Sequence, residues 1–448
     1  MIKKSTLIVL LCAVVLGGVV YYVSVRQSAK EKSTASTEKA LFAVNTNDIV
    51  ALTLSHPSKP DISAIQFEKE NGEWKIVKPI ETDADQPSVE GVVNGLGAAL
   101  ISGTEPGTPD RLKAFGLDPG AISLEFELKG GAKHTLLLGD KDFTGDSVYA
   151  LADAGKTVDL LPQTLLVSSD KSLEDLRDRS VLRVKSEDVA SFNLKNTSGE
   201  ISAAKENAGW SLTKPAKAPA DTETVDSLLA EVSTAKMESV ESEKPENLGK
   251  YGLGAPAITL TTLDSKGNKQ TLIVGKKDGD TYFAHDLSRP MIFRISEDVY
   301  QKLNENFGDF RDKTVLHFVS DQIDRAEVHN TNGTVVIYRK EKGKEDWAFD
   351  EPASEKGKAA ASWKVFSPIE GARAEEVLDH VPAGVAASLA KPPIEVTLTG
   401  DDGKKTTLAV SKPEGEFVYV RTSESPSFFK LKKQFYDDMN FPAAQAQF

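Results

Sequence analysis

A short pattern that occurs three times constrains the fold of this chain more than any other feature. It consists of a Trp, any residue, an aliphatic residue, two further residues and a Pro. Alternating apolar and polar residues predict a half-buried strand, and Pro, which lacks a backbone N–H, marks the end of that strand. We assign the copies to residues 74–79, 210–215 and 363–368. The structural anchors of the repeat are then Trp74, Pro79, Trp210, Pro215, Trp363 and Pro368.

The three tryptophans have two possible roles, because an exposed Trp can also stack on a sugar ring. Their equivalent positions in three repeats favour burial in a core over a carbohydrate platform. We therefore expect Trp74, Trp210 and Trp363 to be buried. Trp347 is expected to be exposed, since it lies in the strongly charged stretch 341–358.

Apolar residues with helical spacing follow the first two copies and predict one amphipathic helix in each repeat. Asp85 and Asp221 stand in front of these helices, where an N-cap is expected. In the third repeat Pro382 and Gly384 interrupt the apolar face, which predicts a shorter or kinked helix. The apolar positions are Val89, Val92, Val93 and Leu96, then Val225, Leu228, Leu229 and Val232, then Leu378, Val381 and Val385.

Each repeat continues with a hairpin, because two alternating strands flank a turn that contains Gly. The hairpins begin at Ile122, Ile258 and Ile394, which are equally spaced along the chain. A turn made of an aromatic residue, Gly and Leu precedes the first two hairpins, at residues 115–117 and 251–253. The Gly suits a left-handed turn that directs its neighbours into a core.

The N-terminal part of the chain contains an apolar segment. Residues 7–25 carry no charge, and nineteen residues at about 1.5 Å per residue span roughly 28 Å, close to the hydrocarbon thickness of a membrane. A cleaved signal peptide is the alternative, although such peptides have a shorter apolar core and a small-residue cleavage site. We expect an uncleaved anchor over residues 1–26, a flexible tether over 27–39, and the acidic body outside the cytoplasm.

Together these patterns predict an α+β fold class. An N-terminal transmembrane helix is followed by three tandem repeats of mostly antiparallel sheet with packed helices. The length of 448 residues fits several domains. The first repeat is expected over residues 40–179, the second over 180–313, and a divergent third over 314–448.

The side chains offer little for catalysis, metal binding or cofactor binding. The histidines lack the spacing of a metal site, and the only cysteine, Cys12, lies in the apolar segment. A net charge of −13 disfavours nucleic acid as a partner. Arg177 with Asp178, and Arg311 with Asp312, are expected to be salt bridges that brace repeat junctions instead of catalytic pairs. We predict no catalytic residue, no cofactor and no metal.

The Trp strands, the turn at 115–117 and the sequence Arg-Asp-x-Ser/Thr-Val-Leu at 177–182 and 311–316 resemble an uncharacterised bacterial family, domain of unknown function 4340. The resemblance covers residues 40–448. It implies a membrane-anchored envelope protein, encoded beside ABC transporter permeases and their auxiliary subunits. It supplies no catalytic residue.

The leading functional hypothesis is a non-catalytic accessory or scaffold protein outside the cytoplasm. It would be held by residues 7–25 as a single-pass protein of the bacterial inner (cytoplasmic) membrane and bind a transporter permease, its auxiliary subunit or another envelope protein. The third repeat departs most from the pattern, so we expect the partner surface there. Two alternatives stay open. One is a module that binds envelope polysaccharides or small ligands in clefts between repeats, and the other is a hydrolase with an unrecognised site.

Overall fold

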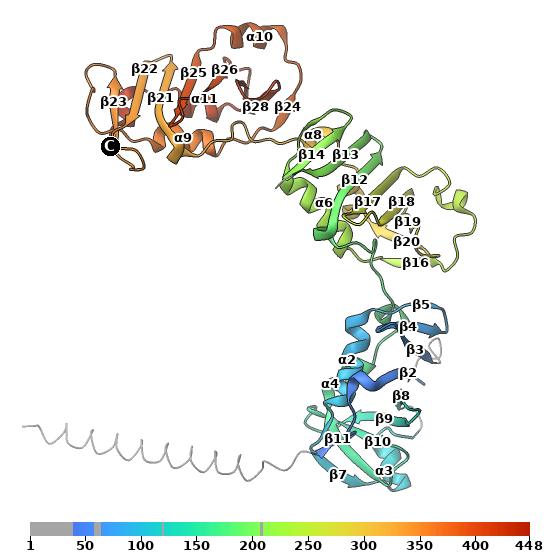
Figure 1. The fold of residues 1–448 in the computed structure, drawn as a ribbon. Coiled ribbons are helices and arrows are strands. Elements are labelled where there is room, and N and C mark those ends of the chain that lie inside the picture. Colours follow the sequence, from blue (N-terminus) through green and yellow to red (C-terminus); the bar gives the residue numbers. More distant parts are fainter. Residues whose placement is uncertain (1–38, 58–63, 119–120, 207–208) are drawn as a thin grey trace, which may run out of the picture. The chain divides into compact units, whose positions relative to one another are not determined.

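The computed structural model describes residues 39–57, 64–118, 121–206 and 209–448 (Figure 1). The chain separates into two compact units, with the division between Arg179 and Ser180. In the described ranges no helix is both long enough and apolar enough to cross a membrane. The expected transmembrane segment, residues 7–25, lies outside the described residues.

The predicted α+β fold class is wrong, because the structure is mostly β-sheet. Strands make up 43% of it and helices 23%, and the strands form four antiparallel sheets. The error arose from connecting segments such as Gly103–Pro106 and Ser239–Ser242, which are polar and irregular in sequence. They pair as edge strands through their backbone groups, which side-chain periodicity does not report.

The first unit contains a nine-stranded sheet with the order β5-β4-β3-β2-β8-β9-β10-β11-β7, and a small sheet of β1 and β6. Its elements are β1 (Lys39–Ala40), η1 (Thr46–Asp48), β2 (Ile49–Ser55), β3 (Ile65–Glu70), β4 (Glu73–Lys78), β5 (Thr82–Asp83), α2 (Gln86–Gly97), β6 (Leu100–Ile101), β7 (Gly103–Pro106), α3 (Pro109–Ala114), β8 (Ile122–Leu128), β9 (Lys133–Lys141), β10 (Ser147–Ala152), β11 (Thr157–Pro162), α4 (Gln163–Ser169) and α5 (Leu173–Leu176).

The second unit contains two further sheets, and the first of them repeats the same strand order: β15-β14-β13-β12-β17-β18-β19-β20-β16. Its elements are η2 (Ser186–Asp188), β12 (Val189–Asn196), β13 (Gly199–Glu206), β14 (Gly209–Lys214), β15 (Ala218–Pro219), α6 (Thr222–Thr234), β16 (Ser239–Ser242), η3 (Leu248–Tyr251), β17 (Ile258–Asp264), β18 (Lys269–Asp278), β19 (Thr281–Asp286), β20 (Ile292–Ser296), α7 (Glu297–Leu303) and α8 (Phe307–Phe310).

The third large sheet has eight strands in the order β23-β22-β21-β25-β26-β27-β28-β24 and lacks a counterpart of β5 and β15. Its elements are η4 (Ser320–Gln322), β21 (Ile323–Asn330), β22 (Gly333–Arg339), β23 (Trp347–Glu351), α9 (Trp363–Glu370), β24 (Glu376–Leu378), α10 (Ala383–Ala390), β25 (Ile394–Gly400), β26 (Lys405–Val410), β27 (Phe417–Thr422), β28 (Phe428–Lys432), α11 (Gln434–Met439) and η5 (Ala443–Ala446).

Each of the three large sheets consists of two local meanders joined in the middle by one long-range pair, and a short strand from the segment between the meanders is added at the far edge. These edge strands are β7, β16 and β24, which pair with β11, β20 and β28. The central pairs are β2 with β8, β12 with β17 and β21 with β25. The predicted hairpins at Ile122, Ile258 and Ile394 are confirmed as β8–β9, β17–β18 and β25–β26, with the same register in each. The longest helix in each of the first two main cores is α2 or α6, and shorter helices add residues to the same cores: α4 and α5 in the first repeat, and α7 and α8 in the second (Figure 1).

The helices of the first two repeats agree with the sequence. The eight apolar positions predicted for α2 and α6 are all buried. Asp85 and Asp221 are N-caps, since their carboxylates accept hydrogen bonds from the amides of Ser88 and Thr224 at 3.1 and 2.9 Å.

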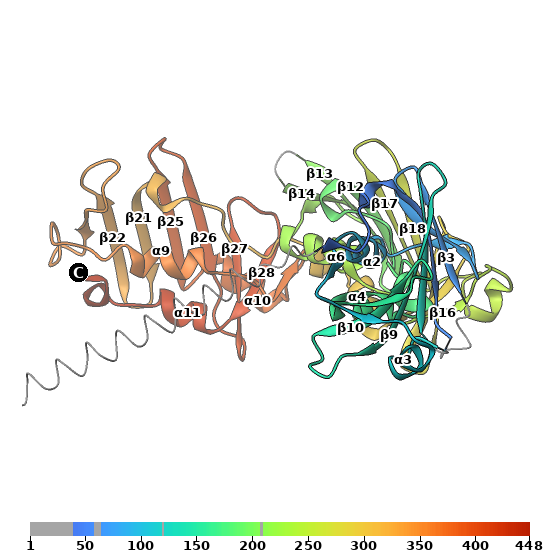
Figure 2. The same cartoon turned by 90° about the horizontal axis from the view of Figure 1, so that it is seen from below.

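The helix predicted around Leu378 and Val385 in the third repeat is wrong. Leu378 ends strand β24, and Val385 belongs to α10, which covers the opposite face of the sheet in a small cluster with Leu389 and Ala409. The main core of this repeat is covered by α9, with Val365 and Ile369 buried, and by α11, with Phe435 and Met439 buried. Both helices are labelled in Figure 2.

In the first two sheets the Trp of the pattern lies under a cation of the neighbouring strand. Trp74 is fully buried and Trp210 is 6% exposed. Trp74 pairs with Lys69 and Trp210 with Lys205, and each ammonium lies 5.3 Å from the centre of the indole ring. Such a contact adds cation–π attraction to the burial of the ring.

The third copy of this arrangement contains Trp347, so the assignment of Trp363 is wrong. Trp347 is 2% exposed, pairs with Arg339 on β22, and has the guanidinium carbon 4.8 Å from its ring. Trp363 is 60% exposed at the start of α9, and Pro368 lies inside that helix. Residues 347–352 do fit the pattern, with Phe349 in place of the aliphatic residue.

We predict that Trp347→Ala lowers the free energy of unfolding by about 3–5 kcal/mol, as Trp210→Ala does, because both remove a buried aromatic side chain. Trp363→Ala serves as the control and should change it by less than about 0.5 kcal/mol, since its ring is mostly in solvent. Guanidinium unfolding followed by circular dichroism measures all three. A large loss for Trp363→Ala, or none for Trp347→Ala, would contradict the corrected alignment.

Candidate functional site

The last residues of each repeat return to the segment in front of its own main helix. The amides of Asp85, Asp221 and Ala361 donate to the carbonyls of Leu176, Phe310 and Ala446, each at 2.8 Å. The bridges next to these bonds pair Ala84 with Arg177, Ala220 with Arg311, and Ala360 with Gln447. The predicted junction residues Arg177 and Arg311 therefore occupy the same position in two successive repeats.

Arg311 joins the second sheet to the third within the second unit. Its side chain is almost fully buried, and it donates to the carboxylate of Asp379 at 2.8 Å and to the hydroxyl of Ser427 at 2.7 Å. It also donates to the carbonyl of Val377 at 3.3 Å. We call this junction the seam and define it by residues 216–221, 307–317, 372–379 and 422–429.

Arg311 and Asp312 do not form the expected pair but make two separate interactions. The carboxylate of Asp312 accepts from the amide of Thr314 at 2.9 Å and lies 2.6 Å from Nε2 of His317. Neighbouring residues of an extended chain point to opposite sides, which explains why they do not meet. In the first unit Arg177 is 1% exposed and its guanidinium contacts Glu174 at 3.3 Å, while the amide of Asp178 donates to the carbonyl of Asp83.

A second ion pair crosses the seam at the start of α6. The guanidinium of Arg373 donates to the carboxylate of Asp221, which is 4% exposed and also caps the helix. Burial raises the pKa of Asp221, but the amide and hydroxyl of Thr224 and the charge of Arg373 lower it, and the net pKa is below the ordinary aspartate value. The seam thus depends on a carboxylate that stays ionised.

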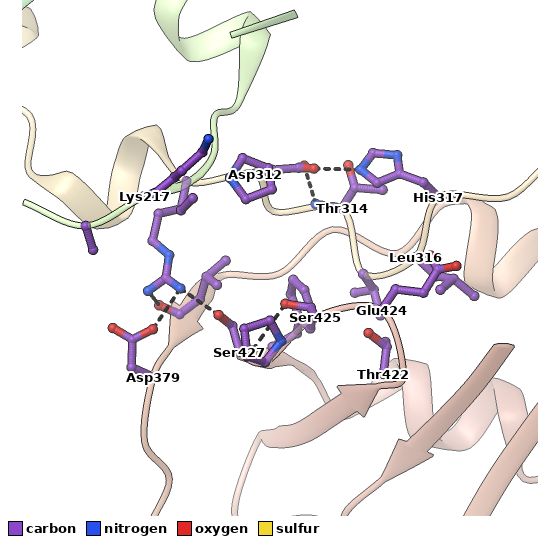
Figure 3. Close-up of a pocket in the computed structure, with 18 of the residues that line it drawn as sticks. Lys217, Asp312, Thr314, Leu316, His317, Asp379, Thr422, Glu424, Ser425 and Ser427 are labelled. Atoms are coloured by element: carbon purple, nitrogen blue, oxygen red, sulfur yellow. Dashed lines mark hydrogen bonds and ion pairs between the residues drawn. The ribbon is translucent and has the colours of Figure 1, made fainter. Parts of the chain in front are cut away.

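Beside the ion pair of Arg311 and Asp379 the seam leaves a pocket of about 320 Å³, drawn in Figure 3. Apolar residues of the second and third repeats form part of its wall, among them Phe307 of α8, Leu316 of the segment between α8 and η4, and Phe429 of β28. The charged side chains around it are the carboxylates of Asp312, Asp379 and Glu424 and the cations of Lys217 and Arg311. Mixed charge beside an apolar wall suits a polar side chain with an aliphatic stem.

Other polar clusters hold the repeats together. The side-chain amide of Asn196 donates to the carbonyls of Leu303 and Glu305, and Asn330 bonds in the same way to Met439 and Phe441. At the corresponding place in the first repeat His56 lies 2.6 Å from Asp170. Over the described ranges no group of three His, Cys, Asp or Glu could hold a metal ion.

Comparison with known proteins identifies the repeat. A family model described as domain of unknown function (DUF4340) matches residues 74–211 and 210–392, which is more than half of the chain. The chain belongs to this family. The two matches begin at Trp74 and Trp210, the first residues of the pattern in two repeats. The first match ends within β14, and the second ends two residues before β25.

No curated protein matches this DUF4340 protein. Among solved structures, the binding domain of botulinum neurotoxin DC in complex with SialylT is 8% identical, over 85% of this chain and 79% of that chain. The TM-score is 0.08, which carries no argument about fold or function.

Sequence reasoning placed Arg311 and Asp312 at the junction of the DUF4340 repeats but missed the pocket. Asp379 and Ser427 are 68 and 116 residues from Arg311 in the sequence, and no local pattern links them. One signal was available: residues 423–427 of the third repeat differ from the equivalent 287–291 of the second in every position but the Pro.

We predict that Asp221→Asn lowers stability by about 1–2 kcal/mol at pH 7, because Asn still caps the helix but no longer pairs with Arg373. The folded pKa of Asp221 is depressed, so its stabilising contribution is complete above the unfolded pKa of about 3.9 and is lost as pH falls through the lower folded value. The free energies of unfolding of the wild type and of Asp221→Asn, measured in urea from pH 3 to 7, should therefore converge at the acid end.

The matched control is Asp85→Asn, which changes the equivalent cap of α2 and should cost only a few tenths of a kcal/mol. Equal losses for the two variants, or a difference between wild type and Asp221→Asn that stays constant down to pH 3, would show that the ion pair contributes nothing to the seam.

Proposed function

We propose that this DUF4340 protein is a non-catalytic accessory or scaffold protein that binds a protein of the bacterial cell envelope. Residues 7–25 would attach it to the cytoplasmic membrane, with the repeats outside the cytoplasm. The partner would be the permease or an auxiliary subunit of an ABC-type transporter, or a member of another envelope complex. The apolar N-terminal segment and the family resemblance support this location and this kind of partner.

The observation that carries the proposal is the pocket at the seam. It is lined by residues of two repeats, which Arg311 and Arg373 connect through ion pairs, so the two repeats position its walls relative to each other. Pockets that combine a few oriented polar groups with apolar walls are typical of places where a partner inserts a side chain. Most of this pocket belongs to the third repeat, where the sequence departs most from the other two.

A photoreactive residue at Lys217 of the full-length protein, expressed in its native membrane, should capture one discrete protein partner. The matched control is Glu81, the equivalent exposed residue of the first repeat, which lies after the Trp strand in the same way. We expect an adduct at 217, none at 81, and loss of the adduct when residues 314–448 are removed.

Adducts only at position 81 would move the partner surface to the first repeat, and a lack of adducts at every surface position would overturn the proposed function. Turnover of any substrate by residues 40–448 would overturn the non-catalytic assignment.

One observation favours the polysaccharide-binding alternative, namely the exposed ring of Trp363. An exposed indole can stack on a sugar ring. If this alternative holds, envelope glycans should change the Trp fluorescence of the wild-type protein, and Trp363→Ala should abolish the change. Glycan binding with no adduct at position 217 would favour this function over the scaffold.

A further inference from the structure

In the second repeat a buried ion pair fills the space beside the segment where that repeat begins. Arg289 is 4% exposed and Asp286 is fully buried, and Nε of the arginine lies 2.9 Å from the carboxylate. The other end of the guanidinium donates to two backbone carbonyls, of Ser180 at 2.5 Å and of Val181 at 3.1 Å. The end of β19 is thereby tied to the entering chain.

Strand register gives the counterparts of the two charged residues in the third repeat. Leu272 pairs with Asp286 in the second sheet, and Leu408 pairs with Thr422 in the third. The separation along the sequence is the same from Leu272 to Leu408 as from Asp286 to Thr422. The same separation aligns Pro290 with Pro426. Thr422 therefore replaces Asp286, and Ser425 replaces Arg289.

The two backbone acceptors have counterparts as well. In the second repeat Ser180 forms a β-bridge with Lys236, and the amide of Val181 donates to the carbonyl of Ala235. In the third repeat Thr314 forms a β-bridge with Arg373, and the amide of Val315 donates to the carbonyl of Ala372. The entering chain thus takes the same course in both repeats. The carbonyls of Thr314 and Val315 correspond to those that Arg289 binds in the second repeat.

All four counterparts line the seam pocket: Thr314, Val315, Thr422 and Ser425 (Figure 3). The pocket therefore stands where the second repeat holds an arginine side chain. Thr422 is 7% exposed, and its hydroxyl is buried without a hydrogen-bond partner. A buried hydroxyl without a partner destabilises the folded state, so a donor that reached it would form a favourable hydrogen bond.

We propose that the seam pocket receives the guanidinium group of an arginine from the protein partner, in the position that Arg289 occupies in the second repeat. This inference rests on the proposed function and adds the chemistry that the pocket recognises. The carbonyls of Thr314 and Val315 and the hydroxyls of Thr422 and Ser425 accept its N–H groups.

The charges and walls of the pocket fit this ligand. Three carboxylates and two cations line it, and one of the carboxylates, Glu424, belongs to the segment 422–426 that replaces 286–290 of the second repeat. Lys404 and Thr406 both bond to Oε1 of Glu424. The aliphatic stem of the arginine lies against Leu316 and Phe429. A guanidinium fits better than an ammonium, since several donors in one plane match acceptors on several sides.

The direct test measures binding of three probes to the full chain by nuclear magnetic resonance: the N-acetyl amides of arginine, of its neutral isostere citrulline, and of lysine. We expect the arginine probe to bind at least tenfold more tightly than the citrulline probe and several-fold more tightly than the lysine probe, with shifts at Thr422 and Ser425. Equal binding of arginine and citrulline would overturn the proposal.

Variants test the position of the ligand. Ser425→Arg places an internal guanidinium in the pocket and should abolish binding of the arginine probe, while Ser198→Arg adds the same charge on an exposed turn and should leave it unchanged. Glu424→Gln, an exposed change that leaves folding intact, should weaken binding at least threefold. Unchanged binding in Glu424→Gln and in a folded Ser425→Arg would place the ligand elsewhere and overturn the proposal.

The same variants separate this inference from the proposed function. If the adduct formed through position 217 persists in Ser425→Arg, the protein partner is real but does not use an arginine here. If no adduct forms anywhere and the arginine probe still binds in the predicted way, the pocket is confirmed and the scaffold function is wrong. Loss of the adduct in Ser425→Arg, but not in Ser198→Arg, would support both.

Discussion

Two backbone hydrogen bonds determine where one repeat ends, and the rest of the structure depends on them. In the second repeat they join the amide of Asp221 to the carbonyl of Phe310, at 2.8 Å, and the amide of Asp312 to the carbonyl of Pro219, at 3.0 Å. The first repeat has the same two bonds, from Asp85 to Leu176 and from Asp178 to Asp83. Arg311 lies between these two bonds, so its side chain points away from its own sheet. It can therefore form hydrogen bonds with residues of the third repeat.

The parts of the fold that the sequence could predict are those with local periodicity. The faces of α2 and α6, their aspartate caps and the equally spaced hairpins follow from spacing alone. The third Trp could not be placed by pattern matching, because Trp363 and Trp347 both precede a suitably spaced Pro. A helical reading was available at Trp363, where Val365, Phe366 and Ile369 are buried on one face of α9. The strand that begins at Trp347 was not predicted, because the residues around it are strongly charged.

The candidate site was less predictable, since it depends on side chains brought together by the tertiary fold. Sequence proximity suggested Arg311 with Asp312, whereas the guanidinium meets Asp379 of the next repeat. The pocket becomes visible only when the second and third repeats are compared at equal register. A repeated scaffold makes such comparison informative, because one copy shows which side chain fills a space that another copy leaves open.

The long-range pair at the centre of each large sheet has a consequence for the growing chain. Strand β2 begins at Ile49, but its partner β8 begins only at Ile122. The partners of β12 and β21, which are β17 and β25, are comparably distant in the sequence. At roughly 5–20 residues per second, synthesis leaves each first meander with an open edge for several seconds. Non-local pairing is also the slow part of folding. Because the three large sheets share their central strand order, the open edge of one first meander also suits the second meander of another repeat, and sequence divergence among the repeats disfavours that mispairing.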